Sequence, residues 1–391
     1  MVTRIAPQRG FPDSEFERRT RCAQRLMAQA GFDALLLTTE PEVRWFTGFH
    51  TQFWHSPTRP WFVVVPADGK PVAVIPAIGE SGMAQTWIDD VRVWSSPDRD
   101  ADGLAMLVEC LRSFAQRHRV IGLPMGHESH LRMPLNDFEQ VREQLDDVRI
   151  ADARPLLRSL REIKSEAEID KIRHICALTG DAFEALPSLV SAGMTEREIC
   201  TVLKLDILRR GADDVPYLIA GSGRGGYDSI IMGPTDRIVE RGDVLIIDTG
   251  AVFDGYFCDF DRNFAFGAAD DLVRRAHEVC WDATQAGFEM ARPGATAQDL
   301  WCAMWQVLEA GGALGSDVGR LGHGLGMQLT EGHSNMRGDE TLMRSGLVLT
   351  LEPGMAFAPG KLMVHEEDIV IREEGSELLT ARAARAMRQI D

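Results

Sequence analysis

The sequence predicts two domains, an α/β domain followed by an α+β domain, with a boundary near residue 160. The first half of the chain alternates helical patterns with short apolar runs. The second half combines hairpin patterns with two long amphipathic helices, and a helix-rich segment at 156–186 separates the halves. A chain of 391 residues is long enough for two domains of ordinary size.

The first half begins with a helical pattern at 14–32, which Ser14 can cap and which Gly31 terminates. Two Val- and Ile-rich runs at 61–77 surround Asp68-Gly69, a pattern typical of a β-hairpin. The remaining elements are a strand at 33–40, a helix at 102–118 and a strand at 119–124. This alternation predicts an α/β domain.

The second half begins with two capping-box patterns, Ser165 with Glu168 and Thr195 with Glu198. An apolar stripe of isoleucines follows the first box and indicates a helix face that packs on a core. Beyond these helices, hairpin patterns and long helices at 270–290 and 296–312 predict α+β organisation.

Composition excludes several classes of protein. The net charge is −17 without a basic block, so nucleic acid and anionic membranes are not expected partners. The chain begins with no signal-peptide pattern and has no 18-residue apolar run. The seven cysteines are an odd number without a C-x-x-C pair, which argues against a disulfide framework. We expect a reduced, cytoplasmic protein.

The segment 244–267 holds the first candidate site. Asp254-Gly255 is a strong two-residue turn, and pairing outward from it places Asp248 opposite Asp261 and Gly250 opposite Asp259. The three aspartates then share one face, with opposite Cβ atoms about 4.5–5.5 Å apart. Apolar neighbours indicate burial. Such acids must share a proton or surround a cation, which can be a metal ion, Arg262 or a charged substrate.

Other acids and two histidines occur in similar surroundings. Glu352 ends an apolar run before Pro353-Gly354. In the run that follows His365, alternation places Glu367 on the opposite face from Glu366 and Asp368. The glycine-rich stretch LGHGLGMQLTEGHSN, residues 321–335, holds His323 and His333, which suit a metal site, proton transfer or an ordinary loop.

The ordered set Asp248, Asp259, His323, Glu352 and Glu367 resembles the five-residue signature of the pita-bread superfamily. That superfamily includes methionine aminopeptidase, prolidase, creatinase and ectoine hydrolase. The first half resembles the creatinase/prolidase N-terminal domain. The resemblance therefore implies an N-terminal creatinase-like domain at 1–160 and a pita-bread catalytic domain at 161–391.

In the metallopeptidase members those five positions hold two divalent ions, and oxygen ligands with one imidazole suit Mn, Co or Zn. Accessory peptidase residues are nevertheless missing. Thr330 stands where a peptidase has histidine, Asp261 replaces a threonine, His365 replaces an arginine, and the loop RGGYDSI has no histidine. These departures predict a non-peptidase without a cofactor. The alternatives are a two-metal Xaa-Pro aminopeptidase or dipeptidase, and a creatinase-like amidinohydrolase.

The branch that the sequence resembles most is ectoine hydrolase, through GYFCDFDRNF, GHGLGMQLTE and MVHEEDIVI. The implied reaction opens a cyclic amidine such as ectoine or hydroxyectoine to an N-acetyl diamino acid, in compatible-solute catabolism. The four acids would surround the cationic ring, and His323 would act as general base or acid. Alternatively, Asp248 attacks the amidine carbon directly. A binding protein without turnover is the remaining class.

The resemblance also implies a homodimer in which the N-terminal loop of one subunit lies near the other's site. The expected substrate is a small cationic or zwitterionic molecule. Arg59 would then bind its carboxylate, and Trp54 and Trp61 would shape the pocket, unless the two tryptophans are ordinary packing residues. The other expected substrate-binding residues are Tyr227, Asp261, Thr330, Glu331 and His333.

Overall fold

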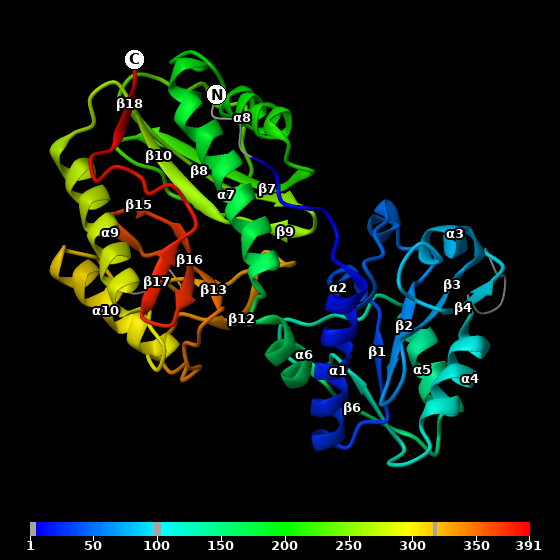
Figure 1. Ribbon diagram of the computed structural model, residues 1–391. Coiled ribbons are helices and arrows are strands. Elements are labelled where there is room, and N and C mark those ends of the chain that lie inside the picture. The colour runs from blue at the N-terminus through cyan, green and yellow to red at the C-terminus, as the bar shows by residue number, and fades with distance from the viewer. Residues whose placement is uncertain (1–4, 97–102, 316–318) are drawn as a thin grey trace. The chain divides into compact units, whose positions relative to one another are not determined.

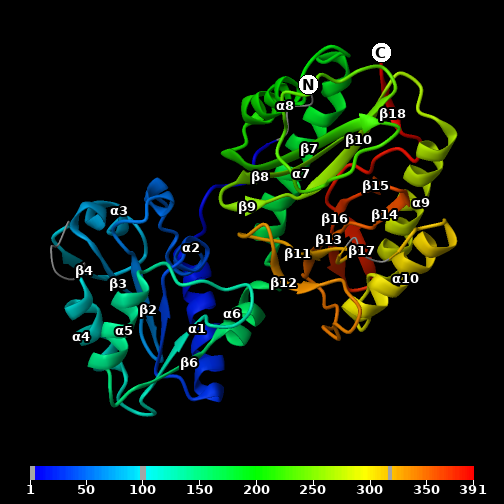
Figure 2. The same cartoon turned by 180° about the vertical axis from the view of Figure 1, so that it is seen from behind.

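The computed structural model describes residues 5–96, 103–315 and 319–391. The chain divides into two compact units (Figures 1 and 2). One unit is Gln8–Arg161, and the other is Glu162–Asp391 together with residues 5–7. Within the described segments, no helix combines the length and the apolar character that a membrane crossing requires.

The N-terminal unit is built on a mixed six-stranded sheet with the order β4-β3-β2-β1-β5-β6. The predicted hairpin at Asp68-Gly69 is confirmed, because β2 and β3 pair antiparallel and Gly69 adopts a φ of 87°. The strands are β1 (Ala34–Leu37), β2 (Phe62–Pro66), β3 (Val72–Pro76), β4 (Asp90–Trp94), β5 (Val120–Leu123) and β6 (Arg149–Asp152).

Helices cover both faces of this sheet, with α4 and α5 on one side and α1 on the other (Figures 1 and 2). Apolar side chains of α4, such as Leu107 and Leu111, share a core with Leu36 of β1 and Val64 of β2. The helices are α1 (Asp13–Ala30), α2 (Glu40–Thr47), α3 (Glu80–Met83), α4 (Leu104–Phe114), α5 (Leu135–Gln144) and α6 (Arg154–Arg161), with short 3-10 turns at Gln52–His55 and Ala77–Gly79.

The first helix differs at its start from the sequence prediction. It begins at Asp13 after Pro12, so Ser14 lies inside the first turn and does not cap it. A proline before the helix needs no hydrogen bond from its nitrogen, which suits that position. The predicted end at Gly31 is confirmed, since this glycine has a φ of 73° and closes the last turn.

The C-terminal unit contains two five-stranded sheets and a two-stranded ribbon. The first sheet has the order β18-β10-β8-β7, with β9 also paired to β8, and the second has the order β12-β11-β13-β16-β17. The strands are β7 (Asp214–Arg224), β8 (Asp243–Phe253), β9 (Tyr256–Phe257), β10 (Phe260–Phe266), β11 (His323–Gly324), β12 (Glu331–Ser334), β13 (Val348–Leu351), β14 (Gly354–Ala358), β15 (Lys361–Val364), β16 (Glu367–Arg372), β17 (Gly375–Leu378) and β18 (Arg388–Ile390).

Two pairs of helices flank these sheets. The pair α7 and α8 contacts β8 and β7, whereas α9 contacts the second sheet and the ribbon and packs beside α10. Both predicted capping boxes, at Ser165 and Thr195, are present. The helices are α7 (Glu166–Ala185), α8 (Glu196–Arg210), α9 (Asp271–Met290) and α10 (Ala297–Ala310), with a 3-10 turn at Leu186–Ser188.

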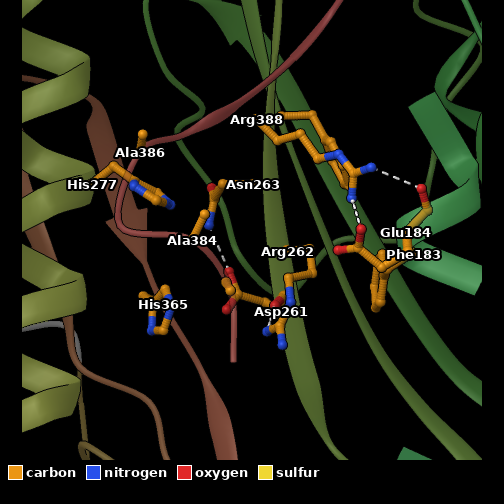
Figure 3. Close-up of a pocket in the computed structure, with 12 residues that line it drawn as sticks. Phe183, Glu184, Asp261, Arg262, Asn263, His277, His365, Ala384, Ala386 and Arg388 are labelled. Atoms are coloured by element: carbon orange, nitrogen blue, oxygen red, sulfur yellow. Dashed lines mark hydrogen bonds and ion pairs between the residues drawn. The ribbon is translucent and has the colours of Figure 1, made fainter. Parts of the chain in front are cut away.

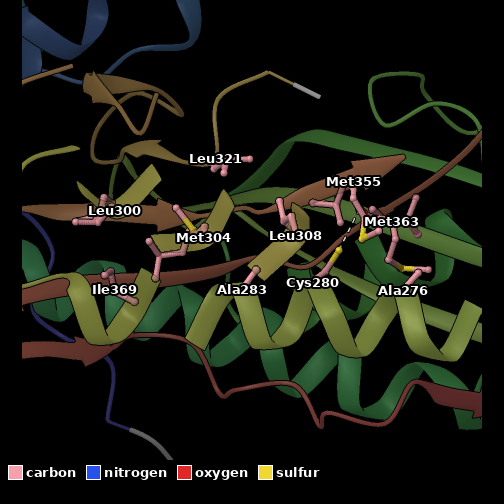
Figure 4. Close-up of a cluster of buried hydrophobic side chains, with 14 of the residues drawn as sticks. Ala276, Cys280, Ala283, Leu300, Met304, Leu308, Leu321, Met355, Met363 and Ile369 are labelled. Carbon is pink, nitrogen blue, oxygen red and sulfur yellow. Dashed lines mark hydrogen bonds between the residues drawn. The ribbon is translucent and has the colours of Figure 1, made fainter. Parts of the chain in front are cut away.

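The core of the C-terminal unit lies where α9 and α10 meet the curved strands (Figure 4). Cys280 of α9 and Met304 of α10 are fully buried there, together with Met355 and Met363 of the ribbon. Burial of this apolar layer holds the second sheet in place, and two acidic residues of the candidate site adjoin its strands, Glu352 after β13 and Glu366 before β16.

Candidate metal centre

The hairpin β8–β10 positions the first acids. Its turn is Asp254-Gly255, with φ angles of 50° and 84°, and Phe253 pairs with Tyr256 across it. The predicted register is confirmed, since Asp248 and Asp261 are Cα partners. Asp259 lies one residue before β10, so it belongs to the irregular segment between β9 and β10 and not to the regular ladder.

His323 begins β11 and points its ring at the acids. Its Nδ1 lies 3.0 Å from the carbonyl oxygen of Gly324, so Nδ1 carries the proton and the Nε2 lone pair remains for a partner. That Nε2 lies 3.3 Å from Asp259 Oδ2 and 4.0 Å from Glu352 Oε2. Gly322 permits this approach: its φ is 134°, and a Cβ there would lie 2.2 Å from the carbonyl oxygen of Thr350.

The position of the last acid in the cluster differs by one residue from the sequence prediction. Ligand atoms of Asp259, His323 and Glu366 lie within 4.8 Å of one another, so Glu366 occupies the place that the signature gave to Glu367. The Glu367 carboxylate is held elsewhere, by Arg262 at 3.0 Å, by the backbone nitrogen of Ala383 at 2.9 Å and by the Thr380 hydroxyl. Arg262 therefore pairs with Glu367.

The clustered carboxylates are poorly satisfied by protein groups. Among the described residues, one oxygen each of Asp248, Asp259, Asp261 and Glu366 is buried without a hydrogen-bond partner. Burial raises the pKa of Asp259 to about 8. Burial, and then repulsion from Asp259 and neighbouring acids, also raises the pKa of Asp248 and of Glu366. Divalent cations would give the unpaired oxygens a partner and would reduce the repulsion between the carboxylates. Carboxylate oxygens together with one imidazole are suitable ligands for such cations.

Further groups orient these acids. Asp368 accepts hydrogen bonds from the backbone nitrogen of Asp259 at 3.0 Å and from Cys176 Sγ at 3.2 Å. The Tyr217 hydroxyl donates to Asp248 Oδ2 at 3.2 Å. Such outer contacts fix the direction of ligand atoms before a cation arrives.

A cavity of about 260 Å³ opens onto the cluster. Its polar wall includes Asp248, Asp261, Glu352 and Glu366, and its apolar wall includes Ile230 and Ile231; Tyr217 and Arg320 also line it. Sequence reasoning missed Glu366, Tyr217 and Arg320. For Arg320 a signal existed, because it lies three residues before His323 and directly precedes the glycine-rich stretch.

The other predicted residues of this unit differ in position. Thr330 accepts a hydrogen bond from Arg320 at 3.1 Å. Glu331 is buried and bound to Lys164 at 3.2 Å, and His333 is buried on β12. Tyr227 is fully buried and donates to Asn263 Oδ1 at 2.9 Å. Of the residues that we expected to bind substrate in this unit, Asp261 lines the cavity, whereas Tyr227, Thr330, Glu331 and His333 are not among its lining residues.

Arg59, Trp54 and Trp61, which we expected near the site of a partner subunit, belong to the N-terminal unit. Trp61 is 1% exposed, and its ring centroid lies 5.1 Å from that of Phe49 and 6.2 Å from that of Trp54. Arg59 Nε donates to Ser96 Oγ at 3.0 Å. These contacts favour the alternative interpretation of Trp61 as a packing residue. A role for Arg59 and Trp54 at the site of a partner subunit stays a prediction, as does the homodimer.

A second cavity, of about 250 Å³, borders the site behind Asp261 (Figure 3). Asn263 Nδ2 donates to Asp261 Oδ2 at 2.7 Å, and Asn263 in turn accepts a hydrogen bond from the Tyr227 hydroxyl. The Tyr227–Asn263 pair therefore fixes the position of the Asp261 carboxylate. His277 and His365 also line this cavity, and their ring centroids are 6.0 Å apart.

We expect acid to destabilise the protein through His277. Burial lowers the pKa of this histidine to about 4, below the 6.5 of an unfolded chain. The unfolded state therefore binds the proton first, and stability falls as the pH drops from about 6.5 toward about 4. The loss at pH 5 is about 2 kcal/mol. Urea unfolding of wild type and His277→Asn at pH 7.5 and 5 measures it, and an equal loss in both proteins would contradict the assignment.

Known proteins resemble this chain over most of its length. It is 28% identical over 369 residues to the probable dipeptidase PepE of Mycobacterium tuberculosis, covering 94% of each chain. It is also 28% identical over 240 residues to the Xaa-Pro dipeptidase of Pyrococcus furiosus, covering 61% of this chain and 66% of that one. The crystal structure of dipeptidase PepE from Mycobacterium ulcerans superposes with a TM-score of 0.84 at 25% identity, covering 97% of this chain and 99% of that one.

These relatives correct the expected function. Proteins named as dipeptidases and Xaa-Pro dipeptidases match the chain, so the expectation of a hydrolase that opens a cyclic amidine or another non-peptide C–N bond is wrong. The replacement of an accessory peptidase histidine by Thr330 therefore does not exclude a peptidase.

Two family assignments complete the comparison. Residues 19–163 match the creatinase/prolidase N-terminal domain, and residues 170–374 match the metallopeptidase family M24. The predicted superfamily and two-part fold are confirmed. The expectation of no cofactor is wrong, because the family is one of metallopeptidases and the cluster of Asp259, His323 and Glu366 suits a metal ion. The chain belongs to metallopeptidase family M24.

Proposed function

We propose that this protein is a metal-dependent peptidase that hydrolyses dipeptides. The observation that carries the proposal is the convergence of Asp259, His323 and Glu366 within 4.8 Å, on a cluster whose carboxylate oxygens have too few protein partners. The names of the relatives, dipeptidase and Xaa-Pro dipeptidase, support the same reaction class.

The residues that would hold metal are Asp248, Asp259, His323, Glu352 and Glu366. Four carboxylates and one imidazole suit a pair of Mn, Co or Zn ions. Such ions, when bound, polarise the scissile carbonyl and lower the pKa of water. The negative charge of four carboxylates balances two divalent cations, which removes the repulsion that raises the pKa of Asp248 and Glu366.

Glu352 is the candidate for proton transfer. It lines the cavity, and its side chain is 22% exposed, so it can reach both water and substrate. Glu352 would take a proton from the attacking water at a carboxylate oxygen and deliver it to the nitrogen of the departing amino acid.

The remaining walls place the substrate. Ile230 and Ile231 offer an apolar surface for a side chain of the peptide. Tyr217 holds Asp248 in place through its hydroxyl, as Asp368 holds the backbone of Asp259. A dipeptide is a zwitterion, which agrees with the expected charge of the substrate.

The test uses the full-length protein stripped by chelator and reloaded separately with Mn²⁺, Co²⁺ or Zn²⁺. We expect at least one metal to restore hydrolysis of members of a dipeptide panel that includes Xaa-Pro sequences, with two equivalents of metal bound by mass spectrometry. Chelation should abolish this activity. Failure to cleave any dipeptide with every metal would refute the proposal.

A further inference from the structure

The cavity behind Asp261 has the size and the lining of a second binding site within the C-terminal unit (Figure 3). Its volume is about 250 Å³, and Phe183 and Phe264 form part of an apolar lining. Ala384 and Ala386 also line it and are exposed, so the cavity adjoins solvent along the C-terminal segment. An apolar cavity of about 150 Å³ can already hold benzene, so this one can hold a ring with a short substituent.

The lining carries polar atoms that lack partners. His277 Nδ1 lies 3.2 Å from the carbonyl oxygen of Arg385, which can only accept, so Nδ1 carries the proton and Nε2 keeps a lone pair. Among the described residues, His365 Nε2 and Asp261 Oδ1 are buried without a hydrogen-bond partner, and the Glu367 carboxylate is 3.6 Å from that Nε2. A buried polar atom of this kind costs free energy until a ligand or water pairs with it.

The charges of the lining do not balance locally. Arg388 pairs with Glu184 at 2.7 Å, and Arg262 pairs with Glu367 at 3.0 Å, so both arginines of the lining are committed to other acids. Asp261 forms no ion pair with a basic side chain in the described part of the chain, and its hydrogen-bond donor is a neutral amide. A ligand that completes this cavity should therefore be positively charged.

A primary ammonium group on a short apolar body meets these requirements. The ammonium carries three N–H donors, which suit an imidazole lone pair and a carboxylate oxygen. Burial lowers the pKa of His277 to about 4, so this ring is neutral at pH 7 and does not repel a cation. A metal ion fits less well, because the described residues bring three ligand atoms within 4.8 Å at Asp259, His323 and Glu366 and not in this cavity.

We propose that this cavity binds a small protonated primary amine, with its ammonium group toward His277 and Asp261 and its apolar part against Phe183 and Phe264. The site is separate from the substrate cavity, and the inference does not depend on the peptidase reaction. Asp261 lines both cavities and is the Cα partner of Asp248, so a bound amine would adjoin the metal centre without occupying it.

The experiment titrates para-fluorobenzylamine and, separately, para-fluorobenzyl alcohol into the full-length protein and follows binding by fluorine NMR at pH 7.5. Both probes have the same shape, but only the amine carries a charge. We expect the amine to bind with a Kd of about 1 mM or tighter, and the alcohol to bind at least tenfold more weakly, by roughly 1.4 kcal/mol. The titration is repeated after loading with Zn²⁺, which occupies the carboxylates of the metal cluster, and the amine should still bind.

Two variants locate the bound amine. Ala384→Phe fills the cavity from an exposed position. His277→Asn keeps a donor in the place of Nδ1 but has no Nε2, so it removes the acceptor. Each variant should weaken amine binding by about tenfold or more. The matched control is Gln389→Phe, which adds the same ring at an exposed residue of β18 outside the lining and should leave the Kd unchanged.

Several results would overturn the inference. They are equal binding of the amine and the alcohol, an amine Kd that either variant leaves unchanged, and amine binding that Zn²⁺ abolishes, which would place the amine among the cluster carboxylates. Urea midpoints verify that each variant is folded, and the two changes lie in different elements, so a folding defect in one leaves the other as the test. A protein that cleaves no dipeptide would lose the proposed function, whereas this titration would still decide the second site.

Discussion

Glu366→Gln is expected to weaken both hydrolysis and metal binding strongly, whereas Glu367→Gln should retain both. Glu366 lies with Asp259 and His323 in the cluster, and replacing its carboxylate with an amide removes a charged ligand. Loss of an outer-shell partner already costs about 10–100-fold in metal affinity or activity. We therefore expect loss of a ligand to lower kcat by roughly 1000-fold, together with the loss of about one equivalent of metal.

The neighbouring variant is the matched control. Glu367 is fully buried and accepts hydrogen bonds from Arg262 and from Ala383, so its role is to stabilise the second sheet. Glu367→Gln should lower the free energy of unfolding by about 3–5 kcal/mol, because it removes the buried charge partner of Arg262 and places an amide nitrogen among hydrogen-bond donors. Metal content and kcat should stay within about twofold.

Mass spectrometry of bound metal, kcat with a cleaved dipeptide and urea unfolding give the three readouts. The reverse pattern, in which Glu367→Gln loses metal and Glu366→Gln keeps it, would show that the sequence signature had the right residue. Loss of metal in both variants would mean that the fold around β16 is too fragile to separate the two roles.

This pair also shows how far sequence reasoning reaches. Alternation correctly placed Glu366 and Glu367 on opposite faces. Which face meets the cluster depends on where β15 ends and β16 begins, and on the pairing of Leu351 of β13 with Glu367 of β16. Those are contacts with distant segments, so a signature read along the chain chose the wrong neighbour.

Local patterns succeeded where the turn alone decides the structure. Asp254-Gly255 predicts a tight turn, and that turn fixes the register that places Asp248 opposite Asp261. Tyr227 failed for the opposite reason. Its sequence neighbourhood indicates a loop near the site, yet its ring is buried and its hydroxyl holds Asn263, which no local pattern predicts.

Arg320 illustrates a residue that sequence reasoning could have found. It lies three positions before His323, so it must be near the cluster whatever the fold. Its direction, however, depends on the hydroxyls of Thr330 and Ser334, which reach it only after β12 folds back beside β11. The replacement of a peptidase histidine by Thr330 therefore has a structural consequence, since the threonine supports the arginine.

Lys171→Met is expected to destabilise the C-terminal unit by about 3–5 kcal/mol. Lys171 of α7 lies 2.7 Å from Asp254 Oδ2, and the two side chains are only 1% and 9% exposed. Removing the lysine takes a positive partner away from a buried carboxylate, which costs far more than the intact pair contributes. Asp254 also forms the turn of the hairpin that carries Asp248 and Asp259, so the defect reaches the site.

A double variant tests the cause. Asp254→Asn removes the charge and still tolerates the positive φ of 50°, so Lys171→Met/Asp254→Asn should recover more than half of the stability lost by Lys171→Met. Urea unfolding measures the three free energies, and hydrogen exchange should locate the loosened amides in β8 and β9. The exposed pair of Arg197 and Asp236 is the control, and Arg197→Met should leave the urea midpoint unchanged. If the double variant is no more stable than Lys171→Met, the stranded charge of Asp254 is not the reason, and the packing of the lysine stem against its neighbours becomes the explanation to test.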